Sequence, residues 1–456
     1  MFLPKDVLTV LNKLNKAGYE AYVVGGAVRD YIMGLEPHDY DITTSALPAQ
    51  IKEVFPEHFA LGEKFGTISV ITESEPIEVT TFRKDSDYSD GRHPDKIEFV
   101  TSVYDDLCRR DFTMNAIAYN PQTGFVDPFD GVVDIQNKVV RCVNNPVDRF
   151  NEDGLRIIRA ARFAAKLGFE IESNTLQAMK DTIDMIDCVA EERIGPEFVK
   201  ILISVHAEEV IKKYSFIISK IIPEYQNVLE CKQNNPHHIY SLEDHILKVV
   251  SGVKRNERIR LAAFFHDIGK PVVSVYDEDG VEHFPGHAGE GAIITEKVMT
   301  RLRFPAKEIK DVGLLVKYHD SFWEPTKRNT KNLLSNLGDE LFFEIVELRK
   351  SDIAAQTARE DNSIEELMEF YHQIKEENAA IKLKDLAIGG NDLINEFKIA
   401  PSPLFGKVLN TLLEMVMDEQ IANERDSLIA AAEKIIQNEK DCWDDSQQSF
   451  FYAKLA

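Results

Sequence analysis

Residues 25–30, Gly-Gly-Ala-Val-Arg-Asp, followed at 39–41 by Asp-Tyr-Asp, form the stretch that decides the fold. The apolar residues 21–24 before them predict a strand that runs into the two glycines, and a helix is expected after the turn. Glycines let the backbone approach phosphates and a helix N-terminus attracts anions, so Gly26 and Arg29 are candidates for binding a triphosphate. The alternative is a bare strand-to-helix turn in which Arg29 pairs with an acid.

The two aspartates indicate a metal site. Asp39 and Asp41 lie two residues apart in an expected strand, where alternate residues share a face. Paired carboxylates suit Mg²⁺, and two such ions about 3.5–4 Å apart can activate an attacking hydroxyl and stabilise a leaving pyrophosphate. Glu78, on a later strand, can supply a third carboxylate. Asp-x-Asp alone is usually solvated surface, but its spacing of ten residues from Arg29 favours the catalytic interpretation.

The rest of the chain divides into a head of strands and helices and a long helical remainder. Residues 4–18 predict an amphipathic helix, and residues 67–72 and 77–82 predict strands rich in β-branched side chains. Residues 84–96 predict a polar, mobile loop, and from about residue 146 the pattern is almost entirely helical. The expected fold class is therefore α+β, with a mixed sheet in the head.

The composition is typical of a globular protein. Of 456 residues, 44% are hydrophobic and 29% charged, and no run approaches the ~18 apolar residues of a membrane helix. The N-terminus lacks a signal-peptide pattern, and the five scattered cysteines form no Cys-x-x-Cys pair, so a cytoplasmic location and no membrane are expected. The net charge of −24 means that any RNA-binding surface must be locally basic.

Three further motifs follow in order along the chain: Arg-Arg-Asp-Phe-Thr-Met-Asn-Ala at 109–116, Asp-Pro-Phe-Asp-Gly-Val-Val-Asp at 127–134 and Glu-Asp-Gly-Leu-Arg at 152–156. With the motifs above, they resemble the polymerase-β-like nucleotidyltransferases, and in detail the bacterial class II CCA-adding enzyme and poly(A) polymerase family, through about residue 200. The resemblance implies that the second motif is a hinge between head and neck and that the third selects the nucleotide. It also implies nucleotide binding by three residues of the first: Arg110, with Asp111 and Asn115 near the ribose.

The selecting motif can also be interpreted from its chemistry. Asp153 and Arg156 are three apart in a predicted helix and would be neighbours on one face. A carboxylate accepts and a guanidinium donates hydrogen bonds, which complements the pairing edges of cytosine and adenine and repels those of uracil and guanine. Such buried mismatches can discriminate by ~10⁴-fold or more. The alternative is an exposed intrahelical salt bridge.

Two neighbouring features extend this site. Arg159 and Arg162 follow at three-residue steps, and the resemblance implies that they bind the nucleotide, while apolar residues between them would pack on the other side. Residues 83–94 resemble the family's flexible loop, which helps reshape the pocket from C to A addition. The same residues are compatible with a disordered polar turn.

A second set of residues indicates another metal site. His266 and Asp267 follow four apolar residues in a pattern expected to be helical, where buried polar groups need partners. The order His, His-Asp, Asp resembles the HD phosphohydrolase superfamily, which implies a divalent metal of unknown identity bound by His245, His266, Asp267 and Asp352. Two further histidines, His287 and His319, could bind a second metal or contact phosphate. A metal-bound hydroxide could hydrolyse phosphate esters such as 2′,3′-cyclic RNA ends. The rival is an inactive domain that only supports tRNA binding.

The expected domains are a nucleotidyltransferase head (1–145), a helical neck (146–230), an HD domain (231–360) and a helical, tRNA-facing tail (361–456). In the tail, Gly389-Gly390 and Gly406-Lys407 resemble the family loosely, and Gly406-Lys407 could meet a phosphate at a helix start or form an ordinary cap. The sequence thus predicts an Mg²⁺-dependent enzyme that adds CCA to tRNA from CTP and ATP. An A-adding enzyme, a poly(A) polymerase, an RNA-binding module with a dead head, and a protein whose main activity is the HD phosphohydrolase are the alternatives.

Overall fold

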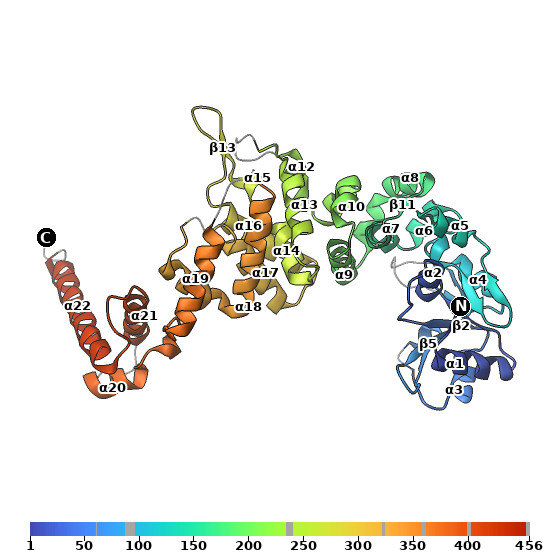
Figure 1. Cartoon of the computed structure of the whole chain (residues 1–456), viewed down its shortest axis with the longest axis horizontal. Helices are drawn as coiled ribbons and strands as arrows, with labels where there is room; N and C mark the ends of the chain where they lie inside the picture. Colours follow the sequence, from blue (N-terminus) through green and yellow to red (C-terminus); the bar gives the residue numbers. More distant parts are fainter. Residues whose placement is uncertain are drawn as a thin grey trace.

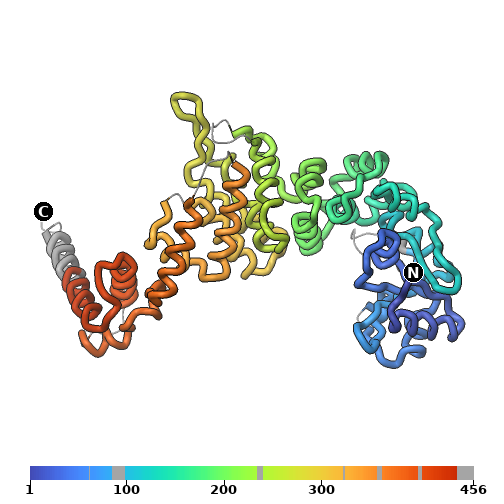
Figure 2. Tube along the Cα trace, viewed as in Figure 1, coloured from blue at the N-terminus to red at the C-terminus, as the bar shows by residue number. Residues whose placement is uncertain are grey.

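The structure is a computed structural model that describes the chain except residues 61, 87–95, 234–239, 322–323, 357–361, 399–402 and 453–456, and except the side chains of 85–86, 96–97 and 439–452. The molecule is elongated, with the N-terminal head at one end, the C-terminal helix at the other and a helical body between them (Figures 1 and 2). Among the described residues, none of the helices combines the length and the apolar character needed to span a membrane.

The head is built on a seven-stranded mixed sheet in the order β3-β4-β5-β2-β1-β8-β9. Strands β1 and β2 are antiparallel, and β2 runs parallel to β5. All four residues of β1 are buried, because helices cover the sheet and its β-branched side chains pack under them. The elements of the head are α1 (Lys5–Lys16), β1 (Ala21–Val24), α2 (Gly26–Ile32), β2 (Asp41–Thr44), α3 (Pro48–Val54), β3 (His58–Phe59), η1 (Glu63–Phe65), β4 (Thr67–Val70), β5 (Ile77–Thr81), β6 (Arg83–Ser86), β7 (Lys96–Phe99), α4 (Val103–Cys108), η2 (Thr113–Asn115), β8 (Ala118–Asn120), β9 (Gly124–Val126), α5 (Gly131–Gln136) and β10 (Val139–Val140).

The next segment is helical and carries the head on one side and the central helices on the other (Figure 1). Its longest helices, α7 and α9, pack against each other, and α9 also packs on α14. The elements are α6 (Pro146–Glu152), α7 (Leu155–Leu167), β11 (Glu170–Ile171), α8 (Ser173–Asp181), η3 (Ile183–Cys188), α9 (Glu191–Leu202), α10 (Ala207–Lys213), α11 (Ser215–Ile221) and α12 (Tyr225–Glu230).

A central helical bundle follows, with a short hairpin, β12–β13, projecting from it (Figure 1). Helix α18 bends at Gly338, whose backbone is not helical. The elements are α13 (Leu242–Gly252), α14 (Glu257–Phe265), α15 (Lys270–Val273), β12 (Val275–Tyr276), β13 (Glu282–His283), α16 (His287–Arg301), α17 (Ala306–Tyr318), α18 (Lys327–Ala354) and α19 (Ser363–Glu376). The C-terminal elements are η4 (Leu383–Asp385), α20 (Gly390–Phe397), α21 (Pro403–Met417) and α22 (Arg425–Tyr452).

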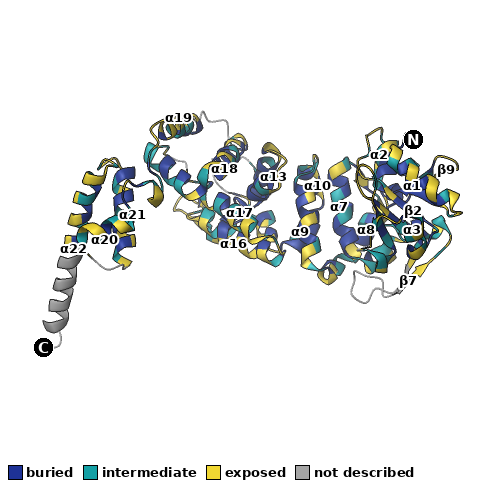
Figure 3. Cartoon of the chain, turned by 90° about the horizontal axis from the view of Figure 1, so that it is seen from below, coloured by how far each residue is buried: buried dark blue, intermediate teal, exposed yellow. Residues whose placement is uncertain are grey.

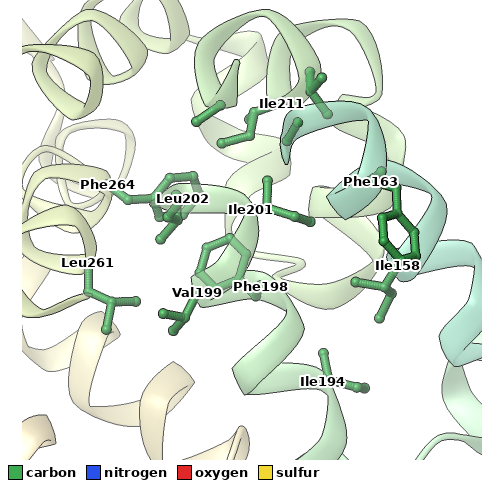
Figure 4. Packing of buried hydrophobic residues seen from close by; sticks show 14 of the residues in the cluster. Ile158, Phe163, Ile194, Phe198, Val199, Ile201, Leu202, Ile211, Leu261 and Phe264 are labelled. Atoms are coloured by element: carbon green, nitrogen blue, oxygen red, sulfur yellow. The ribbon is translucent and has the colours of Figure 1, made fainter. Parts of the chain in front are cut away.

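The buried hydrophobic residues of the described chain form three clusters. The largest runs from the head through the neck helices to α19 without a break, a smaller one is formed by the C-terminal elements, and a third lies within the head. Figure 4 shows Phe163 and Ile158 of α7 near Ile201 of α9, and Phe198 of α9 near Phe264 of α14. In each region the helices carry buried residues on one side and exposed residues on the other (Figure 3). The head and central bundle are therefore joined by packed apolar side chains.

The mixed sheet confirms the expected fold class, while three local expectations were wrong. Asp39 precedes strand β2, which begins at Asp41. Asp153 and Arg156 do not share a helix, because Asp153 is the extended residue that ends α6 and α7 begins at Leu155. His266 is the C-cap of α14 and Asp267 lies beyond it. Most of the polar loop expected at 84–96 lies outside the described residues, between β6 and β7.

Candidate functional site

The acidic cluster of the head lies where β2 meets its neighbours. Val24 of β1 pairs with Asp41, and Ile42 pairs with Val79, so the sheet register puts Asp41 next to Glu78. Asp41 retains some exposed surface, but the surrounding protein removes water from its carboxylate, and this desolvation raises the pKa of Asp41. The charge of Arg110 lowers the pKa of Asp41, and the charge of Asp39 raises it. Desolvation by burial and the charge of Asp41 likewise raise the pKa of Glu78. The charge of Asp39 therefore acts on Asp41, and the charge of Asp41 acts on Glu78.

Arg110 is held over the glycine turn by Asp106, an acid that no motif in the sequence singled out. Asp106 is fully buried and accepts hydrogen bonds from Arg109 (2.8 Å) and Arg110 (3.2 Å). Gly25 has φ of +72°, and a Cβ there would lie 3.3 Å from Nη1 of Arg110. A side chain at Gly25 would thus be strained and would crowd the arginine. The i,i+4 spacing of Asp106 and Arg110, which spans the end of α4, was the signal available in the sequence.

A chain of hydrogen bonds links the glycine turn to helix α7. Arg29 is 3% exposed, pairs with Asp30 (2.6 Å) and donates to Oδ1 of Asn115 (2.7 Å). Asn115 donates to Asp111 (3.2 Å), which accepts a second bond from Arg159 (2.6 Å). The structure thus brings together four predicted nucleotide-binding residues. Arg29 also pairs with an acid, Asp30, as the alternative of a bare strand-to-helix turn predicted. Although burial opposes ionisation, Arg159 lowers the pKa of Asp111 to about 2.

The two residues expected to select the nucleotide are held by different partners. Both Oδ atoms of Asp153 accept from the guanidinium of Arg193 on α9, at 3.2 and 2.8 Å. Arg156, 9% exposed, donates to Glu152 at 2.5 Å and to the backbone oxygens of Arg149 and Arg109. Arg193 therefore fixes the Asp153 carboxylate, and Glu152 fixes the Arg156 guanidinium. Asp153 and Arg156 are not an exposed salt bridge within one helix.

Gly154 explains why the helix is interrupted between these two residues. A Cβ at Gly154 would overlap the carbonyl of Met185, with the carbonyl carbon at 2.5 Å. Oδ1 of Asp153 accepts from the N–H of Leu155 (3.0 Å), which caps the new helix. The close approach of η3 thus requires glycine, and the turn separates Asp153 from α7.

Arg162 has a different acidic partner from that of Arg159. It pairs with Glu197 of α9 at 2.6 Å and lies over the ring of Phe163, 3.9 Å from its centroid. Burial lowers the pKa of Arg162, and Glu197 opposes this shift. Arg193 and Glu197, one turn apart on α9, thus hold Asp153 and Arg162, and no spacing in the sequence pointed to them.

The expected hinge segment is fixed by two of its aspartates. Asp127 accepts from the N–H groups of Gly131 (2.7 Å) and Val132 (2.9 Å) and so caps α5. Asp134 is buried and accepts from Thr113 (2.6 Å). The segment is thereby attached to the turn that carries Asn115.

The second predicted site lies within the central bundle. Four histidine rings approach one another in pairs: Nε2 of His245 is 3.2 Å from Nε2 of His266, and Nε2 of His287 is 3.3 Å from that of His319. Asp267 lies between the pairs, and two groups of possible metal ligands share it. The members are His245, His266 and Asp267 in one group, and Asp267, His287 and His319 in the other.

Carboxylates and a lysine complete this site. Asp352 lies 3.2 Å from Nε2 of His245 and accepts from Arg349 (2.8 Å). Lys270 pairs with Oδ2 of Asp267 at 2.7 Å. Although burial opposes ionisation, His266 and Lys270 hold the pKa of Asp267 well below its usual range. Although burial opposes the charged form, Asp267 and Asp352 raise the pKa of His245 to about 9. The donor set of imidazole and carboxylate fits a divalent transition metal.

The two glycine motifs of the tail lie at different places in helices. Gly389 is the N-cap of α20, and its N–H donates to Asp392 at 2.9 Å. Gly406 and Lys407 lie within α21, which begins at Pro403, so they do not form the loop before the helix. The structure thus gives Gly389 an ordinary capping role and leaves Gly406 one turn inside its helix.

Comparison with known proteins gives a consistent result. Residues 21–141 match the Poly A polymerase head domain family, and residues 293–432 match the tRNA nucleotidyltransferase domain 2 family. The chain is similar to the crystal structure of the Bacillus stearothermophilus CCA-adding enzyme in complex with CTP (TM-score 0.71, 25% identity, covering 97% of this chain and 100% of that one). It also shares its fold with the Thermotoga maritima CCA-adding enzyme complexed with tRNA (TM-score 0.56, 20% identity, covering 94% of each chain).

The sequence likeness extends over nearly the whole length. The CCA-adding enzyme of Ligilactobacillus salivarius (strain UCC118) is 31% identical over 441 residues, which cover 95% of this chain and 97% of that protein. Together with the mixed sheet of the head, this likeness shows that the chain is a nucleotidyltransferase and belongs to the CCA-adding enzyme family.

Proposed function

We propose that this chain adds C, C and A to the 3′ end of tRNA without a nucleic-acid template, using CTP and ATP. The observation that carries the proposal is the network from the glycine turn to α7, which joins Arg29 to Arg159 through Asn115 and Asp111. The relatives named above, one bound to CTP and another to tRNA, support the substrates.

The head residues divide the work of nucleotide transfer. The tRNA 3′-hydroxyl attacks the α-phosphorus of the bound nucleotide, and pyrophosphate leaves. Asp39 and Asp41, with Glu78 beside them, would hold Mg²⁺, and the pKa values of Asp41 and Glu78, which are raised mainly by burial, fit a site completed by a cation. Mg²⁺ supplies activation of the hydroxyl and stabilisation of the leaving group when bound. Arg110 and the turn at Gly25-Gly26 would bind the triphosphate.

The selecting residues would act as a fixed substitute for a template base. A carboxylate has about four acceptor sites and a guanidinium five N–H donors, so each retains capacity beyond its protein partner. Arg193 fixes Asp153, and Glu152 fixes Arg156. The remaining acceptor and donor would meet the amino group and ring nitrogen that cytosine and adenine share.

Three tRNA transcripts, ending before CCA, after C and after CC, test this function. Each is incubated with one nucleotide or a CTP–ATP mixture and Mg²⁺, and product lengths are read on a sequencing gel. We expect extension by C, C and A, and refusal of UTP and GTP. One A added to the CC-ending transcript alone would indicate an A-adding enzyme, and a long A tail would indicate a poly(A) polymerase. An Asp41→Ala protein that remained active would contradict the assigned site.

We also propose that the chain has four domains with the boundaries given above, and that the central one is a metal-dependent phosphohydrolase. The buried cluster around Asp267 supports this second function. Its residues His245, His266, Asp267 and Asp352 would hold a divalent metal, which supplies a hydroxide when bound. Release of phosphate from RNA ends, or opening of a 2′,3′-cyclic end, tests the proposal. Nucleotide addition without hydrolysis would favour an inactive domain that supports tRNA binding.

A further inference from the structure

One buried carboxylate in the head connects three parts of the candidate nucleotide site. We infer that Asp106 is a positioning residue, which sets the triphosphate-binding Arg110 and, through the turn after α4, the base-selecting Arg156. The inference rests on the proposed function, because the roles of both arginines come from it. It adds that triphosphate binding and base selection depend on the same carboxylate, although that carboxylate touches neither part of the nucleotide.

The carboxylate of Asp106 is shared between two neighbouring arginines. The Asp106 side chain has no exposed surface, so it cannot contact a nucleotide itself. Its Oδ1 accepts from Nε (3.0 Å) and Nη2 (2.8 Å) of Arg109, and its Oδ2 accepts from Nη2 of Arg110 (3.2 Å). Although burial opposes ionisation, the charges of the two arginines hold the pKa of Asp106 below its ordinary value. Charge-assisted bonds of this kind fix both guanidinium groups.

The same carboxylate contacts the strand that carries the acidic cluster. The hydroxyl of Thr43 on β2 lies 3.2 Å from Oδ2 of Asp106 and 3.2 Å from the carbonyl of Thr80, so it can donate to either. Asp41 begins this strand, and alternate strand residues share a face. The charge of Arg110 is close enough to lower the pKa of Asp41. Asp106 therefore fixes Arg110 relative to the predicted metal ligands.

Arg110 keeps donors for an anion. Its Nη2 is used by Asp106, whereas its Nε is buried and donates to no protein atom among the residues that the structure describes. Its Nη1 faces the glycine turn, since a Cβ at Gly25 would lie 3.3 Å from it. A buried N–H without an acceptor is costly, so the guanidinium is arranged for an anion that enters at this turn.

The turn after α4 extends the effect to the selecting region. Nη2 of Arg156 donates to the backbone oxygen of Arg109 (3.1 Å), and Nη1 of Arg149 donates to that of Cys108 (3.1 Å). Both carbonyls lie at the C-terminal end of α4, whose last turn contains Asp106. By fixing the side chain of Arg109, Asp106 also holds the carbonyl to which Arg156 is attached.

Ligand affinities of the full-length protein test the inference without turnover. Magnesium pyrophosphate, CTP and UTP are titrated by calorimetry into the wild type, Asp106→Asn, Arg110→Ala and the double variant. In Asp106→Asn the amide oxygen should stay on Arg109, which makes two of the three arginine bonds, and the amide NH₂ would then face another donor on Arg110. We expect the affinity for pyrophosphate to fall about tenfold or more. Arg110→Ala should lose as much, and the double variant should be no weaker than Arg110→Ala.

Asp106→Ala tests the link to base selection. This variant also releases the side chain of Arg109, so the carbonyl that Arg156 contacts is no longer fixed. The ratio of the affinities for CTP and UTP should fall about tenfold in Asp106→Ala, as for the loss of one charged hydrogen bond, and stay unchanged in Asp106→Asn. Arg109→Ala removes the same anchor and provides this comparison if Asp106→Ala does not fold.

A matched control and the opposing outcomes complete the experiment. Glu344 accepts two bonds at 2.7 Å from Arg258 in the central bundle, so Glu344→Gln should leave all three affinities unchanged. Wild-type pyrophosphate affinity in Asp106→Asn, or losses that multiply in the double variant, would overturn the inference. An unchanged ratio of CTP to UTP affinity in both Asp106→Ala and Arg109→Ala would overturn the link to Arg156. Coupled affinities in a protein that adds no C, C and A would instead contradict the proposed function alone.

Discussion

At the scale of single residues, Asp111 connects the head to helix α7 through one carboxylate. Its pKa is lowered to about 2, so its ionised form is stabilised by the fold. A lowered folded-state pKa contributes stability above the unfolded value of 3.8 and loses it as the pH falls through about 2. The contribution is about 2 kcal/mol, because one pKa unit is worth about 1.4 kcal/mol.

We therefore expect Asp111→Asn to lower the free energy of unfolding at neutral pH and to remove part of its decline in acid. Urea unfolding from about pH 5 downward compares the two proteins. The gap should narrow as the pH falls, because the wild-type carboxylate becomes protonated. A gap that stays constant with pH would mean that the charge of Asp111 contributes nothing to stability.

A second prediction concerns Arg193, which fixes Asp153 from a helix that the motif does not include. Arg193→Ala should lower kcat/KM for CTP and ATP by about tenfold or more, because a charged hydrogen bond is worth about 1.5–3 kcal/mol. It should also raise misincorporation of UTP, since Asp153 would no longer be fixed. Arg301→Ala removes a comparable two-bond pair with Glu224 elsewhere and should leave both rates unchanged. Equal losses for all four nucleotides would indicate a general structural defect.

Residue types in the site could be predicted from the sequence, but their partners could not. The order of Arg29, Asp41 and Arg156 along the chain is local information. The pairing of Asp153 with Arg193 depends on the packing of α7 against α9, which no local spacing encodes. Asp106 was hidden for a different reason, because an acid next to arginines in a helix is more often a surface pair.

At the scale of elements, the strands and the longer helices follow the hydrophobic pattern of the sequence. The places where helices are interrupted are set by close contacts with other parts of the chain. The periodicity of 152–163 is continuous, so a helix through Asp153 was expected. The break exists because the backbone of η3 passes directly against Gly154. Similarly, α14 ends at Phe265 and frees His266 and Asp267 to meet residues from other helices. Tertiary contacts of this kind override local propensity.

Gly154→Ala tests the importance of that break. We expect a loss of about 3 kcal/mol, because the added methyl group overlaps the Met185 carbonyl and forces η3 and α7 apart. Thermal unfolding with a nucleotide-binding assay measures the change. Gly406→Ala is the control, because nothing lies within 4 Å of its Cβ and alanine favours a helix by up to about 1 kcal/mol. Equal melting temperatures for the two variants would contradict the packing explanation.

At the scale of the whole molecule, the continuous core and the smaller C-terminal core are joined by charged side chains. Lys331, near the start of α18, is 3% exposed and donates to the carbonyl of Met417 and to Glu419, both at 3.0 Å. Lys327 also pairs with Glu419, at 2.9 Å. Because apolar packing holds the rest together and ion pairs hold this junction, the C-terminal part should be the first to separate.

Lys331→Met should therefore lower the melting temperature of the C-terminal core and leave the melting temperature of the main transition unchanged. Hydrogen bonds from a charged group contribute about 1.5–3 kcal/mol, and the variant loses two of them. Differential scanning calorimetry should resolve two transitions, with the smaller one shifted to lower temperature.

If the tail faces tRNA, KM for full-length tRNA should rise in Lys331→Met, while KM for CTP on a short hairpin acceptor stays unchanged. Lys375→Met removes an exposed pair with Asp339 and should have little effect. A single transition whose melting temperature falls as a whole in Lys331→Met would mean that the two cores unfold as one unit. The tail would then have to act on the acceptor as a rigid extension of the central bundle.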